Sequence, residues 1–175
     1  MKLSAVLSWL IFWSACSMNG QSQTNMHCQN PAFDKEVRDW LSFTVPLMDV
    51  QTLEAMPRDS IVLLDAREPE EFAISHIPGA KCIGYKDWDK ALLQNIPKEK
   101  PIVVYCSIGY RSEKIAEKIT RLGYTQVKNL YGSIFEWVNQ GFPVEDESHH
   151  VTQSVHGFNE KWSKWILNPA IKKVW

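Results

Sequence analysis

A strand, a short loop headed by cysteine, and a helix follow one another near the middle of this chain. Residues 101–105 form an apolar β-type run, Cys106 ends it, and a regular helical pattern begins just after Arg111. The first backbone N–H groups of a helix have no partner inside the helix, and the helix dipole makes this end electropositive. A thiol in this position is shifted towards the thiolate, which is its nucleophilic form. The pattern therefore predicts a nucleophile site with Cys106 as the reactive group.

The loop after Cys106 favours this interpretation over simple packing. Cysteine is among the most frequently buried residue types, so packing would be its ordinary explanation. Here, however, a polar loop follows, in which Gly109 can adopt a positive φ and Arg111 offers a planar fork of donors to an oxyanion. The whole candidate loop consists of Cys106, Ser107, Ile108, Gly109, Tyr110 and Arg111.

Strand-like and helix-like segments alternate from residue 44 to residue 143. Strands are expected at 45–50, 61–65, 82–84, 102–105 and 127–131, and helical segments at 51–56, 68–75, 88–94, 112–122 and 133–141. The last helix is expected to open with a capping box between Ser133 and Glu136. This alternation predicts an α/β fold, a parallel sheet with helices on both faces. Ligands bind at the carboxyl ends of such strands, where Cys106 and Asp65 both lie.

Several motifs in the same region resemble one known family. Residues 106–111 resemble the active-site loop of the rhodanese family of sulfurtransferases. Residues 65–67 and 76–80 resemble the D-x-R and H-I-P-G-A signatures of that family, in the right order, and 122–138 resemble its closing strand and helix. The resemblance covers residues 44–143 and implies one rhodanese-like domain.

The resemblance implies sulfur transfer by double displacement, with no cofactor. The Cys106 thiolate would take a sulfane sulfur from a small anionic donor such as thiosulfate and hold it as a persulfide. The backbone N–H groups of 107–111 would cradle that sulfur until a thiol or protein acceptor takes it. Asp65 and Arg67 are expected to brace the site as a buried ion pair. His76 is expected to hydrogen-bond the backbone of the turn that follows it.

The residues of the loop also allow other assignments. Arg111 would hold the anionic donor, or else form a surface ion pair with Glu113 or Glu117, and Tyr110 would shape the mouth of the pocket. Cysteine phosphatases resemble C-x5-R, whereas four residues separate Cys106 from Arg111 here. The shorter loop disfavours a phosphatase or an arsenate reductase. A noncatalytic module is disfavoured because the cysteine is retained, while a redox or persulfide carrier of the cell envelope would use the same thiol.

The first 16 residues resemble an export signal. Residues 5–13 are apolar but too short to span a bilayer, and small residues precede Cys16. The segment also resembles the lipobox of bacterial lipoproteins, in which Cys16 would be lipidated, although Trp13 stands where a leucine-like residue is usual. Cleavage after Ser17, or a cytosolic protein with an apolar first helix, are the alternatives. We expect an exported protein, periplasmic or lipid-anchored to the bacterial membrane.

Two segments flank the predicted domain. Residues 17–43 are expected to form a flexible tether that ends in a short amphipathic helix, packed outside the main fold. Residues 144–175 carry His149 and His150, whose spacing fixes no ligand geometry, so no metal site is predicted. The aromatic and apolar residues of this extension are expected to dock on the domain; they are Phe158, Trp162, Trp165 and Ile166.

The cysteines and the charge exclude some classes of function. If Cys16 is lipidated, Cys28, Cys82 and Cys106 remain, and a catalytic thiol must stay unpaired. A Cys28–Cys82 disulfide has no geometric support, and Cys82 is expected to be a small buried residue, with a resolving role towards Cys106 as the alternative. The net charge of −1 and the lack of a basic, aromatic stripe argue against nucleic acid binding.

Overall fold

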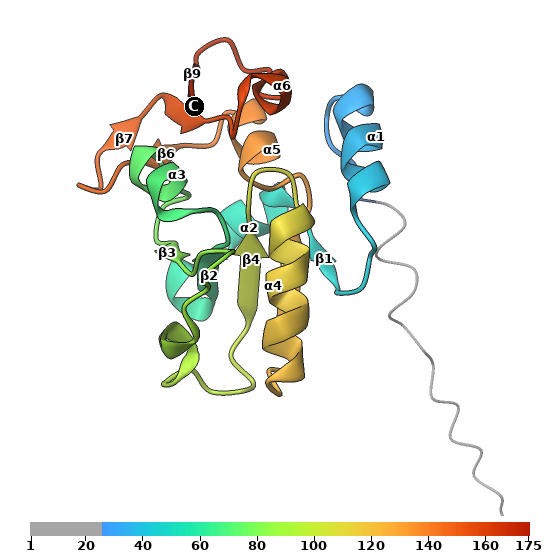
Figure 1. The fold of residues 1–175 in the computed structure, drawn as a ribbon, viewed down its shortest axis with the longest axis vertical. Helices are drawn as coiled ribbons and strands as arrows, with labels where there is room; N and C mark the ends of the chain where they lie inside the picture. Colours follow the sequence, from blue (N-terminus) through green and yellow to red (C-terminus); the bar gives the residue numbers. More distant parts are fainter. Residues whose placement is uncertain (1–25) are drawn as a thin grey trace, which may run out of the picture.

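The computed structural model describes residues 26–175, which contain one central parallel sheet (Figure 1). Its strands are β1 (Leu47–Met48), β2 (Val62–Asp65), β3 (Lys81–Cys82), β4 (Ile102–Tyr105) and β5 (Val127–Leu130). They lie in the order β1-β5-β4-β2-β3, and every neighbouring pair is parallel. Parallel neighbours need a crossover segment between them, which the helices supply. The α/β fold predicted from the sequence is confirmed.

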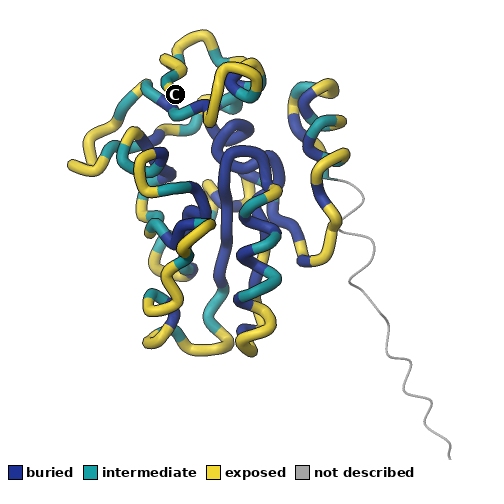
Figure 2. The backbone as a smooth tube through the Cα atoms, in the orientation of Figure 1, coloured by how far each residue is buried: buried dark blue, intermediate teal, exposed yellow. Residues whose placement is uncertain are grey.

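Helices cover both faces of this sheet. They are α1 (Pro31–Trp40), α2 (Val50–Ala55), α3 (Pro69–Ile74), α4 (Tyr110–Arg121) and α5 (Ser133–Asn139), with short 3₁₀ turns η1 (Arg58–Ser60) and η2 (Lys90–Leu93). Side chains of α1, α2 and α5 form a core on one face, and α4 and η2 form a second core on the other. Successive β4 residues alternate between the two cores, as the period of a strand requires. Figure 2 shows β4 and the loop above it as buried backbone.

One predicted helix is shorter and tighter than its sequence pattern suggests. The segment 88–94 forms only the 3₁₀ turn η2, not an α-helix. The Asp89 side chain accepts from Ala91 N–H at 2.8 Å and so begins the turn. Gln94 N–H then bonds to the Ala91 carbonyl at 3.1 Å, an i→i+3 bond that closes it.

Residues 26–43, before the domain, pack into the core, which corrects the expectation that their short helix lies outside the main fold. Residues 17–25 of the expected tether lie outside the described residues. Phe33 and Val37 of α1 are fully buried, and Cys28 is 2% exposed. Cys28 N–H donates to the Asp34 carboxylate at 2.7 Å, which holds the start of the described chain against α1. The predicted signal segment and the proposed lipidation site Cys16 lie outside the described residues. Between residues 26 and 175, every helix is too short or too polar to cross a bilayer.

The C-terminal extension packs on the same face as α1. It contains β6 (Val144–Glu145), β7 (Val151–Thr152), β8 (Ser154–His156), α6 (Glu160–Ser163) and β9 (Lys172–Val174). Val155 and Ile166 are buried in the first core, and the rings of Trp165 and Phe33 lie 5.6 Å apart. Figure 1 shows the extension and α1 at the end of the sheet where the β4–α4 loop lies. The two flanks are therefore placed beside the predicted nucleophile.

Candidate active site

Cys106 follows β4 directly, at the carboxyl end of the strand. The apolar, β-branched residues of β4 favour a buried strand. After the strand, Gly109 is the N-cap of α4. Gly109 has a φ of 125°, and a Cβ at this position would lie 3.2 Å from Leu41 Cδ2. Only glycine adopts this backbone conformation without strain. The loop can therefore turn tightly enough to bring its backbone over the Cys106 side chain.

The Cys106 sulfur lies within this loop and receives a hydrogen bond from it. Gly109 N–H donates to Sγ, with the nitrogen 3.2 Å away, and the Ser112 hydroxyl oxygen lies 3.5 Å from the same atom. Cys106 is 1% exposed. Donors already directed at an atom stabilise negative charge on it without reorganisation. The loop is thus arranged to hold an anionic sulfur.

Ser133 fastens this loop to α5, which corrects its predicted role. The sequence predicts a capping box between Ser133 and Glu136, but the Ser133 hydroxyl instead accepts from Cys106 N–H at 3.1 Å. The N-cap of α5 is Gly132, which makes no side-chain cap. Free N–H groups in the first turn of α5 donate to the carbonyls of Cys106 and Ser107, both at 3.2 Å. Two helix N-termini therefore border Cys106.

Arg111 is paired with a carboxylate that the sequence did not place in the site. Its guanidinium contacts the two oxygens of Glu71 at 2.5 and 2.9 Å and donates to the Ser107 hydroxyl at 2.9 Å. The Glu71 side chain is 3% exposed and that of Arg111 12%. The alternative of a surface ion pair with Glu113 or Glu117 is wrong.

This ion pair keeps both groups charged. Burial is the largest single effect on Glu71 and would raise its pKa, but the hydrogen bonds and charge of Arg111, together with the charge of Arg67, outweigh burial, so the pKa of Glu71 lies below its usual value. Burial would likewise lower the pKa of Arg111, but the hydrogen bond to Glu71 and the charges of Cys106 and Glu71 together outweigh burial, so this pKa lies above its usual value. The positive charge of Arg111 is therefore largely balanced by Glu71 before any anion binds.

A local signal for Glu71 exists in the sequence, but its partner does not follow from it. Glu68 is the N-cap of α3 and Glu71 stands three residues later, the spacing of a capping box. Glu68 N–H donates to Glu71 Oε2 at 3.0 Å. That contact orients the Glu71 carboxylate. Its pairing with Arg111, 40 positions further along the chain, arises only from the fold.

Asp65 and Arg67 form a buried ion pair at the end of β2. Arg67 Nη2 donates to Asp65 Oδ2 at 2.7 Å and to the Ser75 carbonyl at 2.6 Å. Both side chains are fully buried, and neither lines the Cys106 pocket. The pair braces the segment between β2 and the end of α3, which places it behind the site.

His76 has a different partner from the one predicted. Its Nδ1 lies 3.1 Å from the carbonyl of Phe72 in α3, and its Nε2 lies 3.3 Å from Glu145 Oε1. Stacking of the His76 ring on Phe72, with centroids 3.8 Å apart, directs the imidazole back towards the helix. The expected bond to the turn after His76 is therefore wrong.

A pocket of about 470 Å³ opens above Cys106 and is largely walled by aromatic rings. Its lining residues are Trp40, Glu68, Glu70, Glu71, Tyr85, Lys86, Cys106, Ser107, Ile108, Tyr110, Arg111, His156, Phe158 and Trp162. Tyr110 lies at its mouth, 36% exposed. All residues of the loop 106–111 except Gly109 line this pocket, and residues that the sequence did not assign to any site line it as well.

One wall of this pocket comes from the two flanking segments. The Trp40 ring of α1 lies 5.6 Å from the Tyr110 ring and 5.3 Å from the Trp162 ring of α6. The Arg111 guanidinium lies 5.1 Å from the centre of the Phe158 ring. No local pattern predicts these contacts, because they join the two ends of the described chain.

The remaining described cysteines are poor nucleophiles. Cys28, Cys82 and Cys106 are all free thiols. Burial raises the pKa of Cys82 to about 11 and raises that of Cys28 further. Both thiols therefore stay protonated near neutral pH, which disfavours a resolving role for Cys82 towards Cys106.

Within residues 26–175, one group of side chains has the spacing of metal ligands. It consists of His76, Glu145 and His149, whose ligand atoms all lie within 4.8 Å of one another. None of the three lines the Cys106 pocket. The sequence predicts no metal site, because the neighbouring pair His149 and His150 lacks a fixed geometry. The fold supplies that geometry by bringing His76 to His149.

Comparisons with known proteins match the central part of the chain. A sulfurtransferase from Allochromatium vinosum is 33% identical over 86 residues, which cover 49% of this chain and 79% of that protein. Thiosulfate:glutathione sulfurtransferase from Saccharomyces cerevisiae is 28% identical over 105 residues, which cover 53% of this chain and 76% of that protein. Other relatives are much longer, and the chain spans only 22 to 24% of their length.

The fold and the family model agree with these relatives. The crystal structure of the BH2092 protein from Bacillus halodurans has a TM-score of 0.54 and 27% identity, and covers 67% of this chain and 87% of that one. The model of the rhodanese-like domain matches residues 49–140. This chain therefore belongs to the rhodanese-like domain family, whose named members include sulfurtransferases.

Proposed function

We propose that this protein is a sulfurtransferase that carries a sulfane sulfur as a persulfide on Cys106. The observation that carries the proposal is the Cys106 sulfur, which accepts the Gly109 N–H at 3.2 Å on the floor of a pocket of about 470 Å³. The names of two relatives support the same class of reaction. The raised pKa values of Cys28 and Cys82 leave Cys106 as the described thiol best placed to react.

In the first half-reaction the Cys106 thiolate attacks the outer sulfur of the donor. A new S–S bond forms on Cys106 as the donor S–S bond breaks, and the electron pair of that bond leaves with sulfite or with the donor thiolate. With thiosulfate, the negative charge of the cysteine moves to the outer sulfur of the persulfide. Gly109 N–H and the N-terminus of α4 stabilise this charge.

In the second half-reaction a thiophilic acceptor attacks the outer persulfide sulfur. Cyanide would leave as thiocyanate, and a thiolate would leave as a persulfide. The electron pair of the broken S–S bond returns to Cys106 as the thiolate, so the cycle needs no external oxidant or reductant. The pairing of Arg111 with Glu71 and Ser107 keeps the loop in one shape through both steps.

The pocket favours an organic persulfide over thiosulfate as the donor. Arg111 is already balanced by Glu71, and Glu68 and Glu70 add two carboxylates, against one further cation at Lys86. Thiosulfate, which is a dianion, would be repelled by these carboxylates. An organic donor can instead bury its carbon atoms against the aromatic wall, which is worth about 25 cal/mol for each Å² removed from water.

Steady-state kinetics with two donors tests this function. Varying the donor at several fixed acceptor concentrations should give parallel double-reciprocal lines, because the donor product leaves before the acceptor binds. We expect kcat/KM for glutathione persulfide to exceed that for thiosulfate by about tenfold, which corresponds to about 1.4 kcal/mol. Intersecting lines would contradict the persulfide intermediate. Preference for thiosulfate would contradict the donor assignment alone.

We also propose that the protein is exported and anchored by a lipid on Cys16, on the basis of residues 1–16. Labelling of the full chain with a radioactive fatty acid in a bacterial host, followed by fractionation, checks both points. The label should appear in the membrane fraction and disappear in Cys16→Ser. A wild-type chain that stays unlabelled would contradict the anchor, and one that stays in the cytosol would contradict export.

A further inference from the structure

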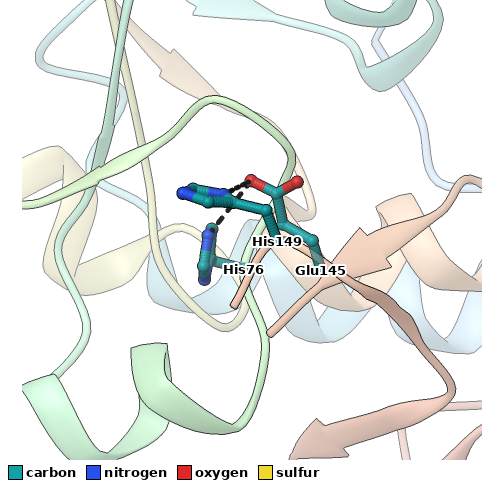
Figure 3. Close-up of side chains that lie close together, drawn as sticks. All are labelled: His76, Glu145 and His149. Carbon is teal, nitrogen blue, oxygen red and sulfur yellow. Dashed lines mark hydrogen bonds and ion pairs between the residues drawn. The ribbon is translucent and has the colours of Figure 1, made fainter. Parts of the chain in front are cut away.

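The side chains of His76, Glu145 and His149 meet where the C-terminal extension joins the domain (Figure 3). His76 follows α3, Glu145 belongs to β6, and His149 lies in the hairpin between β6 and β7. The backbones of His76 and Glu145 exchange two hydrogen bonds, at 2.8 and 2.9 Å. Two of the three side chains therefore start from a fixed relative position, without any help from a ligand.

The two distances from the histidine nitrogens to the Glu145 carboxylate are close to those around a small divalent ion. His76 Nε2 lies 3.3 Å from Glu145 Oε1, and His149 Nδ1 lies 3.0 Å from the same oxygen. Tetrahedral zinc with bonds of about 2.1 Å separates its ligands by about 3.4 Å. Two imidazoles and one carboxylate are a known zinc ligand set, which leaves the fourth position to water. The nitrogens of His76 and His149 lie within 4.8 Å of each other, and the exposed His149 side chain can move to bring them to the separation that the ion requires.

The tautomer of His76 supplies an independent argument. Its Nδ1 lies 3.1 Å from the Phe72 carbonyl, an acceptor, so this nitrogen carries a proton. Nε2 then faces a carboxylate oxygen at 3.3 Å, and this contact is favourable only with a cation between the two atoms, either a proton or a metal ion. The ring is 2% exposed and stacked on Phe72, so it cannot turn away. A histidine whose other nitrogen donates to a backbone carbonyl is the usual arrangement of a metal ligand.

We propose that His76 Nε2, Glu145 and His149 Nδ1 bind one divalent ion of the zinc class. The site lies apart from the Cys106 pocket and has a structural role. It ties the end of α3 to the β6–β7 hairpin, and so to the extension that carries Phe158 and Trp162. One carboxylate and two neutral imidazoles give the ligand set a charge of −1, which is attractive to a divalent cation.

Calorimetric titration of the full chain with zinc chloride tests the proposal. Cys106→Ser serves as the background, because a free thiolate would compete for zinc. We expect one ion per chain and a loss of affinity on the order of 100-fold in His149→Ala. His150→Ala is the matched control, since its side chain is 80% exposed against 76% for His149 and lies outside the cluster. It should bind zinc like the background protein.

Thermal unfolding gives a second readout on the same variants. An ion that binds only the folded chain raises its Tm. Zinc should raise the Tm of the background protein and of His150→Ala, and leave that of His149→Ala unchanged. Absence of stoichiometric zinc binding, equal affinity in the background protein and His149→Ala, or an equal loss in His150→Ala would each overturn the proposal. Because His149 is exposed, its replacement leaves the core intact.

Discussion

The loop around Cys106 and the wall above it are encoded in different ways. The loop is a run of consecutive residues, 106–111, in which the sulfur, its hydrogen-bond donor and the helix N-terminus come together locally. The wall is formed by Trp40, Phe158 and Trp162, which all lie outside the matched residues 49–140 and meet only in the folded chain. The loop therefore lies inside the part of the chain that matches the family, whereas these three wall residues lie outside it. On the proposed function, the loop performs sulfur transfer and the wall selects the substrate.

Replacement of Cys106 should have the largest effect, because it removes the reactive group of the loop and leaves the wall intact. We expect Cys106→Ser to reduce sulfur transfer from every donor by on the order of 10³-fold or more, because a serine hydroxyl does not form a persulfide. Circular dichroism should show an unchanged fold, since serine has nearly the same size. Cys82→Ser, at the end of the edge strand β3, is the control and should keep full activity. Activity retained in Cys106→Ser would assign the chemistry to another residue.

Glu71 links the loop to α3, so its replacement should mainly lower the free energy of unfolding. Glu71→Gln leaves the buried Arg111 without its counter-charge, and we expect a loss of about 3 kcal/mol in the free energy of unfolding. Urea denaturation measures this loss. Glu70→Gln is the matched control, because Glu70 lines the same pocket but is exposed. Equal stability of the two variants would show that the ion pair contributes nothing.

Low pH should weaken the ion pair between Glu71 and Arg111. The pKa of Glu71 is lower in the folded protein than in the unfolded chain. The stability it contributes is therefore present above about pH 4.5 and is lost as pH falls through the folded pKa. The difference in unfolding free energy between the wild type and Glu71→Gln should shrink over this range, since a protonated glutamate resembles glutamine. A difference that stays constant from pH 7 to about pH 3 would contradict the assignment.

The smallest effect is expected at the wall. Phe158→Ala removes a ring that lies 5.1 Å from the Arg111 guanidinium and bounds the pocket. We expect KM for an organic persulfide to rise about threefold, in line with about 0.5–1 kcal/mol for such a contact, with kcat and the reaction of cyanide nearly unchanged. Val151→Ala, in an exposed part of the same extension, should leave every constant unchanged. A fall in kcat in Phe158→Ala would contradict this prediction, because it would mean that the ring contributes to the reaction step as well as to donor binding.

The strands and the loop could be predicted because their signals are short-range. The apolar run of β4, the glycine at 109 and the helical period of α4 each lie within a few residues of Cys106. The ion pair of Asp65 and Arg67 also joins residues two positions apart. In all these cases the sequence neighbours are also the spatial neighbours, so a local pattern is enough.

The partners of Glu71 and Ser133 and the positions of the two flanking segments could not be predicted, because they depend on contacts between residues far apart in the sequence. The capping position orients Glu71, but its pairing with Arg111 needs α3 to lie against the loop. Ser133 has the sequence of a cap, yet the Cys106 N–H takes its hydroxyl oxygen because α5 begins beside the loop. The burial of Cys28 and the approach of His149 to His76 likewise follow from the packing of the two flanks.

Mass spectrometry of the full chain, after incubation with a sulfur donor and no acceptor, shows directly whether Cys106 carries sulfur. We expect the gain of one sulfur atom, located on the peptide that contains Cys106 and released by cyanide. Cys28 and Cys82 should remain unmodified in the same digest. A chain that gains no sulfur from either thiosulfate or an organic persulfide, or that gains it on another cysteine, would contradict the assignment of Cys106 as the sulfur carrier.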